Sequence, residues 1–571
     1  MNENKLKKYI KKIEKLDCFS IFLEKTHNKE IVEISIYSPK EKSIIYFDCS
    51  NNKKKNKFNI KFVLSNLKPY LENSNIKKIG YDFKSDYLLL KKENISLSGI
   101  YFDTMLGLYI IDPFLKKETE KEKKKHIDFL TEELLNNKNH VRKKSKINFY
   151  LYKKINYFLK KDKISKKIFE KIDIPIISVI ARMEMNGILI DKKILKKQLN
   201  EINKKLSNTK KNIQKLEKEK FNFSSNKQTI QILLKRNLIL DKKTKKGKIS
   251  IDKSVLKRLS KNDPFPKNIL KYRSLKKTKS NYIIKLINLI NEKTKKIHTS
   301  YYQTTTISGR ISSKSPNLQN IPVKKQEDRK IRKSFIPTKG NVLLSADYSQ
   351  IELRIIAHLS KDKKLIKNFK ENEDVHLLTA SNIFSKTTEK ISIQQRQFAK
   401  IINFCLIYGI SDFGLSKKLN ISLKNAKKYK ETYYKKYKKI PIFFKKIIKK
   451  TKENGYITTI TGRKININNI NSKNVSSQRS AERQAINLTI QGSVADMLKI
   501  AMIKIDKLIQ KQFILKAKML IQIHDELIFE IKKKYVIKLK KYIYKIMKNS
   551  LTMQVPIEIN IKIGENWNQL F

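Results

Sequence analysis

The alternation of hydrophobic and polar residues changes along the chain and divides it into regions with different expected secondary structure. Residues 17–50 alternate apolar and polar positions, as in SIFLE and VEISIY, and this spacing predicts strands of a twisted sheet. Segments 77–90 and 99–112 mix strand and helix character, so we predict an α/β domain for the N-terminal region. Residues 116–126 and 137–147 are polar and charged, and they predict loops or frayed helix.

Helical spacing of apolar residues begins at about residue 174. Segment 174–191 has this spacing and includes Asn186-Gly187, a pair that favours a helix end. Residues 192–219 predict a long Lys-rich helix, whose charges are explained more simply by solvation than by a binding face, and 271–290 is again helical. From about residue 299 the chain is rich in Gln, Asn, Ser, Thr and isolated carboxylates between apolar strands, as a polar active-site cleft requires.

The charge balance adds a candidate partner to this picture. The 571 residues include 128 Lys and Arg against 52 Asp and Glu, a net charge of +76 that favours binding to nucleic acid. The abundance of Lys, Ile and Asn is also what extreme A+T codon bias produces in any protein, so the charge alone does not decide. With 40% hydrophobic residues, the chain is long enough for roughly three to five folded domains.

The cysteines and the hydrophobic runs bear on location. Cys18, Cys49 and Cys405 form neither a metal-ligand pair nor a disulfide framework, which indicates a reducing, cytoplasmic setting. The basic N-terminus lacks an apolar segment after it, so no signal peptide is expected. No run reaches ~18 uninterrupted apolar residues, so no membrane span is expected.

The first candidate for chemistry is Asp347, in the segment NVLLSADYSQIELRIIAHLS (341–360). The apolar run before it predicts a buried strand, and a helix is expected to start near Ser349. A carboxylate at a strand end is a natural ligand for a hard cation. Taken alone, the segment is explained more simply if Asp347 caps that helix.

The second candidate is a carboxylate pair in KMLIQIHDELIFEI (518–531). Apolar residues on both sides predict a β-hairpin with a tight turn at His524-Asp525-Glu526. Together with Asp347, these carboxylates could hold two ions ~3.5–4 Å apart, the geometry used for in-line phosphoryl transfer.

Two further segments carry polar and aromatic residues at helical spacing. In 392–410, Arg396, Lys400, Phe404 and Tyr408 recur every four residues, as a nucleoside triphosphate site needs, although an ordinary amphipathic helix is the simpler alternative. In 475–500, Arg483, Asn487 and Gln491 share a helix face and could donate to acceptors in a DNA minor groove. The polar loop 306–322 adds Arg310, Asn317, Gln319 and Asn320.

These segments, in this order, resemble the motifs of the family A DNA polymerases, of which bacterial DNA polymerase I is the type. DYSQIELR (347–354) is similar to motif A, RQFAKIINFCLIYG (396–409) to motif B, and HDE (524–526) to motif C. The likeness extends from about residue 174 to 571. It implies a primer-extending DNA polymerase, acting in repair and replication, with two Mg²⁺ or Mn²⁺ ions, primer-template DNA and deoxynucleoside triphosphates, and a monomeric chain.

The resemblance also implies an α/β plus α+β multidomain fold, with a degenerate RNase H-like 3′–5′ exonuclease domain before a right-hand polymerase. The expected division is 1–170 exonuclease-like, 171–300 thumb and start of the polymerase, 301–360 first part of the palm, 361–440 fingers, and 441–571 second part of the palm. The family's separate 5′-nuclease domain is not expected in this chain.

The site residues carried over by the resemblance fall into three groups. Asp347 and Asp525 are expected to bind the metals, with Glu526 beside them and Lys400 as the general acid toward pyrophosphate. The nucleotide is expected to contact Lys324, Gln350, Glu352, His376, Arg396, Phe404 and Tyr408, with Glu352 as the gate against a ribose 2′-hydroxyl. DNA is expected to contact Arg310, Asn317, Gln319, Asn320, Arg483, Asn487, Gln491 and His524.

The exonuclease-like region departs from the pattern that the resemblance implies. Four carboxylates are expected there, and the chain keeps Glu24 and Asp86 but has Phe22 at the first Asp position. A Tyr followed four residues later by Asp is expected near 145–160, and this region has no Asp. We therefore predict that proofreading is lost. The alternatives are residual exonuclease activity, if the last block is misaligned, and a decayed polymerase that only binds primer-template DNA.

Overall fold

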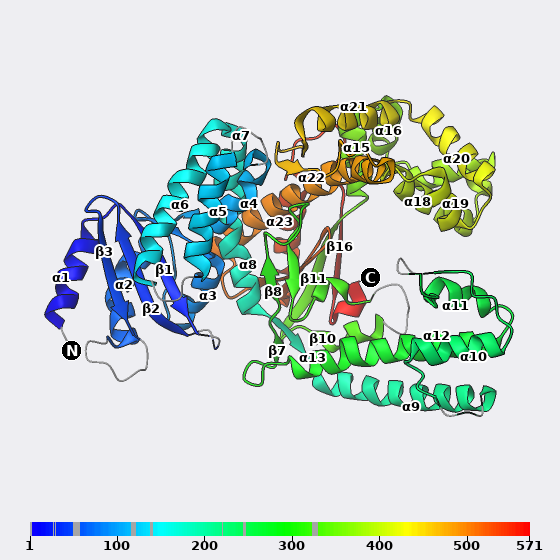
Figure 1. Cartoon of the computed structure of the whole chain (residues 1–571), viewed down its shortest axis with the longest axis horizontal. Helices are drawn as coiled ribbons and strands as arrows, with labels where there is room; N and C mark the ends of the chain where they lie inside the picture. Colours follow the sequence, from blue (N-terminus) through cyan, green and yellow to red (C-terminus); the bar gives the residue numbers. More distant parts are fainter. Residues whose placement is uncertain are drawn as a thin grey trace.

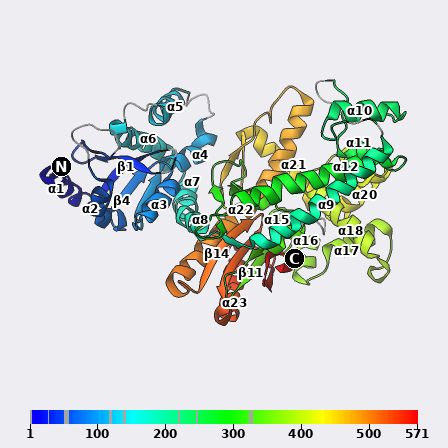
Figure 2. The same cartoon turned by 90° about the horizontal axis from the view of Figure 1, so that it is seen from below.

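The computed structural model describes residues 3–26, 28, 30–49, 58–115, 121–136, 141–217, 219, 221–243, 247–322 and 329–570. An N-terminal domain lies at one end of the molecule, and the rest of the chain is built around a second, central sheet (Figures 1 and 2). No helix among these residues is long and apolar enough to span a membrane, and all three cysteines are free thiols.

The N-terminal domain is an α/β unit, as its residue pattern predicts. Its five strands are arranged in the order β3-β2-β1-β4-β5, with β1 antiparallel to β2 and parallel to β4. Apolar residues of these strands are buried beneath the flanking helices. The strands are β1 (Cys18–Lys25), β2 (Ile31–Ser38), β3 (Ser43–Asp48), β4 (Lys77–Gly80) and β5 (Ile100–Asp103).

The helices of this domain correct one prediction. Residues 121–126 and 141–147 lie in regular helices, because the polar runs belong to longer helices whose apolar residues come later in the chain; 116–120 and 137–140 lie outside the described residues. The helices are α1 (Glu3–Glu14), α2 (Ile60–Glu72), α3 (Phe83–Lys92), α4 (Thr104–Leu115), α5 (Lys121–Asn136), α6 (Val141–Lys161), α7 (Lys163–Ile168) and the π-helical turn η3 (Phe169–Asp173).

The central sheet is four-stranded and antiparallel, in the order β14-β15-β11-β16. Successive side chains of these strands point to opposite faces of the sheet and pack into different apolar clusters. Leu344 and Phe529 belong to the largest cluster, whereas Leu343 and Ile528 belong to another. The strands are β11 (Asn341–Tyr348), β14 (Ala517–Ile523), β15 (Glu526–Lys532) and β16 (Ile559–Gly564), and the helices packed beside them are α8 (Pro175–Asn186), α22 (Val475–Gln512) and α23 (Val536–Lys548).

Two helical regions extend from the central sheet on the side away from the N-terminal domain (Figure 1). One is an arm with its own apolar cluster: α9 (Lys192–Leu216), α10 (Asn226–Lys235), α11 (Lys253–Leu259), α12 (Pro264–Lys277), η4 (Thr278–Ile284) and α13 (Lys285–Asn288). The other contains α15 (Ile351–Ser360), α16 (Lys363–Lys370), α17 (Val375–Phe384), α18 (Ile393–Ile407), α19 (Asp412–Leu419), α20 (Leu423–Lys436) and α21 (Lys439–Asn454).

Short elements complete the description. They are β6 (Ile188–Ile190), β7 (Lys296–Ile297), β8 (Ser300–Tyr302), β9 (Ser312–Lys314), η5 (Leu318–Asn320), η6 (Lys330–Ser334), β10 (Phe335–Ile336), η7 (Thr388–Lys390), β12 (Tyr456–Thr458), β13 (Lys464–Asn466), η8 (Lys533–Tyr535) and η9 (Trp567–Leu570). The predicted helix end at Asn186-Gly187 is confirmed, as are helices within 192–219 and 271–290.

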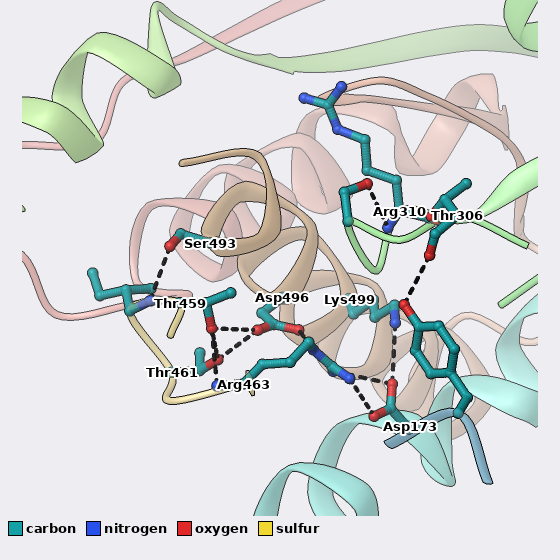
Figure 3. A network of polar contacts seen from close by, with 12 residues as sticks. Asp173, Thr306, Arg310, Thr459, Thr461, Arg463, Ser493, Asp496 and Lys499 are labelled. Carbon is teal, nitrogen blue, oxygen red and sulfur yellow. Dashed lines mark hydrogen bonds and ion pairs between the residues drawn. The ribbon is translucent and has the colours of Figure 1, made fainter. Parts of the chain in front are cut away.

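A buried ionic network joins the end of the N-terminal domain to the central part (Figure 3). Arg463 donates two hydrogen bonds to Asp173, at 2.9 and 3.1 Å, and one to Asp496 at 2.7 Å; Lys499 donates to Asp173 at 3.0 Å. None of the four residues is more than 4% exposed. Burial acts to raise the pKa of Asp173, but Arg463 and Lys499 together lower it below its ordinary value.

We predict that Arg463→Met destabilises the protein by about 3–5 kcal/mol, because it leaves buried carboxylates without their main cationic partner. The free energy of unfolding is measured by urea titration. The matched control is Lys235→Met, whose partner Glu219 is 71% exposed and whose own side chain is 61% exposed. That control is expected to lose less than about 1 kcal/mol. Equal losses of unfolding free energy in the two variants would contradict a stabilising role for the buried network.

Candidate functional site

The candidate site lies where β11 meets the β14–β15 hairpin. The strand register places Asp347 opposite Glu526, and Asp525 occupies the turn between the two hairpin strands. The turn is fixed by the Gln522 amide, which donates to the carbonyl of His524 at 2.7 Å. The predicted strand before Asp347 and the predicted hairpin are both confirmed. Asp347 therefore meets the adjacent carboxylates Asp525 and Glu526, almost 180 residues later in the chain, at one sheet edge.

The alternative in which Asp347 caps a helix is wrong. Asp347 is a residue of β11, and α15 begins two residues later than predicted, at Ile351. The residue at the helix start is Gln350, whose backbone has a φ of 50° and whose side chain makes no capping hydrogen bond. Asp347 is therefore left for another role.

The three carboxyl groups have pKa values above their ordinary range. Desolvation raises the pKa of Asp347 to about 6; desolvation and the charge of Asp347 raise the pKa values of Asp525 and Glu526 to about 7. Among the described residues, no ion pair joins any of the three to a cationic side chain, although the charges of Lys562 and Arg332 act to lower the pKa values of Asp347 and Glu526. Lys562 and Lys540 line the same cavity, of about 600 Å³, without pairing with them.

This arrangement fits a metal that is held partly by its substrate. The described residues contain no group of three or more His, Cys, Asp or Glu side chains arranged to hold an ion by themselves. Mg²⁺ is commonly bound by one or two carboxylates and completed by substrate phosphates and water. Asp347 and Asp525, unpaired and desolvated, have the right chemistry for that kind of site.

A cluster of polar contacts lies near this edge and joins side chains from separate segments of the chain. Arg310 donates to Glu352 at 3.0 Å, and the hydroxyl of Tyr408 donates to the other oxygen of Glu352. Gln491 of α22 lies close to the Tyr408 hydroxyl. Four of the predicted nucleotide-contacting and DNA-contacting residues thus lie together, although they come from four separate segments.

A second cluster lies on α17 and α18. Arg396 donates to Asp374 at 2.5 Å, and the His376 ring is 2.9 Å from Asn403 and packs against Phe404. Burial, with a smaller effect of Lys400, lowers the pKa of His376 to about 4 and keeps its ring neutral at pH 7.

The α18 helix begins with a Ser392–Gln395 capping box and leaves Lys400 exposed. The exposed ammonium group of Lys400 is available to an anion, whereas the partly exposed guanidinium of Arg396 already donates its Nε–H to Asp374. Among the described residues, no hydrogen bond or ion pair joins this cluster to the three carboxylates. Lys324 lies outside the described residues.

The predicted DNA-contacting residues differ in their surroundings. Gln319 holds the hairpin by donating to Gln522, and Asn317 accepts from Ser313. Arg483 lies beside Gly409 at the end of α18, and the side-chain oxygen of Asn487 is buried without a partner. Asn320 ends the short helix η5, and His524 lies exposed in the hairpin turn with a φ of 52°.

The N-terminal domain has a different arrangement around its two remaining carboxylates. Glu24 accepts from Lys144 of α6 at 2.9 Å, and Asp86 pairs with Lys25 at 2.6 Å. The Lys144 ammonium group also lies 4.9 Å from the ring centre of Phe22. Each carboxylate thus already has a cationic partner, and these residues do not fit a pair of catalytic metal ions.

Sequence reasoning missed Lys25 and Lys144. Lys25 follows Glu24 directly, and Lys144 lies in a run of charged residues that predicted a loop or frayed helix. In this Lys-rich chain no local signal distinguishes them from solvated lysines. A helix assigned to 141–161 and packed across β1 would have placed Lys144 over Glu24.

Comparison with known proteins agrees with this geometry. The model of DNA polymerase family A matches residues 192–569, and that of the DNA polymerase I ribonuclease H-like domain matches 19–133. DNA polymerase I of Borreliella burgdorferi is 39% identical over 524 residues, covering 88% of this chain and 56% of the relative. DNA polymerase I of Bacillus subtilis is 35% identical over 526 residues, covering 88% and 58%.

A solved structure extends the comparison to almost the whole chain. The POL domain of Pol1 from M. smegmatis, in complex with DNA primer-template and dNTP, superposes with a TM-score of 0.89 at 27% identity. The match covers 99% of this chain and 98% of that one. The chain spans about half the length of the curated relatives it matches.

We predict that Asp525→Asn stabilises the protein by about 1–2 kcal/mol at pH 8 in the presence of a chelator. The substitution removes one of three crowded negative charges that have no cationic partner, and relieving a strained functional site commonly has an effect of this size. The midpoint of thermal unfolding is measured against Asp17→Asn, an exposed carboxylate of the N-terminal domain. A destabilised Asp525→Asn variant would contradict the repulsion inferred for this edge.

Proposed function

Because the chain belongs to DNA polymerase family A, we propose that it is a DNA-templated DNA polymerase that extends the 3′ end of a primer with deoxynucleoside triphosphates. The observation that carries the proposal is the unpaired carboxylate edge of Asp347 and Asp525, opened toward a cavity on the central sheet. The ligands of the M. smegmatis neighbour, primer-template and dNTP, support the choice of substrates.

The proposed reaction is an in-line displacement. The primer 3′-oxygen bonds to the α-phosphorus of the nucleotide, the bond from that phosphorus to its bridging oxygen breaks, and pyrophosphate leaves. Two Mg²⁺ or Mn²⁺ ions, held by Asp347 and Asp525, would supply activation of the hydroxyl and stabilisation of the leaving group. Glu526 lies beside these ligands on β15.

The α17–α18 cluster is proposed to bind the triphosphate. Arg396 and Lys400 lie one helical turn apart on α18 and present two cations to the phosphates, and Lys400 is the proposed general acid toward pyrophosphate. The neutral His376 has an unpartnered ring nitrogen that suits a phosphate or hydroxyl contact. Lys324 and Gln350 are proposed to join this site, and Phe404 is proposed to pack on the sugar and base.

The Arg310–Glu352–Tyr408 cluster is proposed to read the sugar and the primer end. Glu352 is held on two sides, by Arg310 and by Tyr408, so its position beneath an incoming sugar would be fixed. A fixed carboxylate leaves little room for a ribose 2′-hydroxyl. The proposed minor-groove contacts are Arg310, Asn317, Gln319, Asn320, Arg483, Asn487, Gln491 and His524.

The remaining assignments follow the same proposal. The arm 192–292 is proposed as the thumb, with its lysines against duplex phosphates, the central sheet as the palm (301–360 and 441–571), and 361–440 as the fingers. We also propose a cytoplasmic monomer that acts in replication and repair, a role supported by the relatives named DNA polymerase I.

The N-terminal domain is proposed to have lost proofreading. Lys25 and Lys144 pair with Asp86 and Glu24, and Phe22 stands where a third carboxylate is expected, so two of the four expected metal ligands are engaged by lysines and one is replaced. An ammonium group also contributes no ligand to a metal ion.

We predict that Asp347→Ala lowers primer extension at least about 100-fold, because a metal ligand is lost, while primer-template affinity changes little. Extension is measured with a labelled primer on a longer template, and affinity by fluorescence anisotropy. The matched control is Asp17→Ala, an exposed carboxylate of the N-terminal domain. Parallel loss of affinity and extension would assign Asp347 a structural role instead.

We also predict that a 5′-labelled primer stays at full length when incubated with the protein and Mg²⁺ but without nucleotides, because Glu24 and Asp86 are occupied by lysines. The products are resolved on a denaturing gel. Stepwise shortening from the 3′ end would show a working exonuclease. The same assay on Glu24→Gln would then trace that activity to this domain.

A further inference from the structure

We infer that the N-terminal domain sets the position of Arg310 through the hydroxyl of Tyr109, and so serves the polymerase site as a positioning element. Tyr109 lies on α4, in the domain where Glu24 and Asp86 each pair with a lysine. The inference rests on the proposed function, in which Arg310 contacts the primer end. It gives the domain a role that needs no nuclease activity.

Tyr109 contacts the segment that carries Arg310. Its hydroxyl donates to the carbonyl of Thr306 at 2.9 Å, across 197 residues of sequence. The hydroxyl of Thr306 in turn donates to the carbonyl of Arg310 at 2.6 Å and closes the turn. Gln303, at the start of the segment, donates to the backbone carbonyl of Asp173 at 3.0 Å. The segment 303–310 is therefore fastened at two points to residues of the N-terminal side.

The turn itself is shaped to lie against these partners. Gly309 has a φ of +78°, a conformation that suits glycine. A side-chain carbon added there would have the Arg463 side chain at 3.6 Å and the Tyr109 hydroxyl at 3.9 Å as its nearest neighbours. The turn therefore packs against the side chains of Tyr109 and Arg463.

The position of Arg463 is fixed because its guanidinium hydrogen-bonds two carboxylates. Its guanidinium donates to Asp173 of η3 and to Asp496 of α22, and Lys499 donates to Asp173 as well (Figure 3). The two threonines Thr459 and Thr461 donate to Asp496 from the same loop as Arg463. A displaced N-terminal domain would move both Asp173 and Tyr109, and with them the turn.

The consequence reaches the nucleotide site through Arg310. Its guanidinium donates to Glu352, which also accepts from Tyr408. A shift of the 306–310 turn would change the donor that holds Glu352 from one side. Losing the Tyr109 hydroxyl removes one neutral hydrogen bond, so we expect a moderate effect, about 2–10-fold in kcat/KM for the nucleotide.

The test compares Tyr109→Phe with Tyr70→Phe in the full chain. Both variants lose one phenolic hydroxyl from the N-terminal domain, but that of Tyr70 donates to Glu14 at 2.9 Å on the domain's own surface. Hydrogen exchange followed by mass spectrometry reports on the 303–311 segment. We expect several-fold faster exchange there in Tyr109→Phe only, with an unchanged melting temperature. Equal exchange in the two variants would overturn the inference.

A double-mutant cycle with Arg310→Ala then tests the route. In the parent, Tyr109→Phe should lower kcat/KM, mainly through a higher KM; in Arg310→Ala it should have no further effect. A similar loss in both backgrounds would mean that Tyr109 acts by general destabilisation, which overturns the inference. If the parent does not extend primers, the proposed function fails. The double-mutant cycle is then measured as primer-template affinity, and the inference holds only if Tyr109→Phe weakens binding in the parent and not in Arg310→Ala.

Discussion

The antiparallel register between β11 and β15 is the constraint on which the proposed chemistry depends. It places Asp347 opposite Glu526 and brings Asp525 to the same edge, although the hairpin lies far from β11 in sequence. Because strand side chains alternate with a period of two, a slip of one residue would turn Asp347 toward the opposite face of the sheet. Leu344 and Phe529 on one face, and Leu343 and Ile528 on the other, enter different cores and lock that register.

Asp347, Asp525 and Glu526 differ from Glu24 and Asp86 in whether a lysine pairs with them. At the central edge, desolvation and mutual repulsion raise the pKa values of three carboxyl groups, and no cationic side chain pairs with them among the described residues. Such a cluster is unfavourable by itself and suits a cation supplied from outside. In the N-terminal domain, Lys25 pairs with Asp86 and Lys144 with Glu24, although burial still raises the pKa of Asp86 to about 6.

The sequence predicted what depends on local pattern. The strand before Asp347, the hairpin at His524-Asp525 and the helices of 392–410 and 475–500 are all present, because each is specified by residues close together in the chain. What it could not predict depends on contacts between distant segments. Lys144 meets Glu24 across 120 residues, Tyr109 meets Thr306 across 197, and Arg463 meets Asp173 across 290. Nothing local marks one lysine or one tyrosine among so many.

The most direct measurement is nucleotide incorporation by the unaltered chain. A labelled primer on a longer DNA template is incubated with Mg²⁺ and the four deoxynucleotides, in parallel with the four ribonucleotides. The account predicts extension to the end of the template with deoxynucleotides and little with ribonucleotides. A protein that binds this primer-template but adds no nucleotide would contradict the assignment of Asp347 and Asp525 to catalysis, and would make the chain a DNA-holding relative of the family.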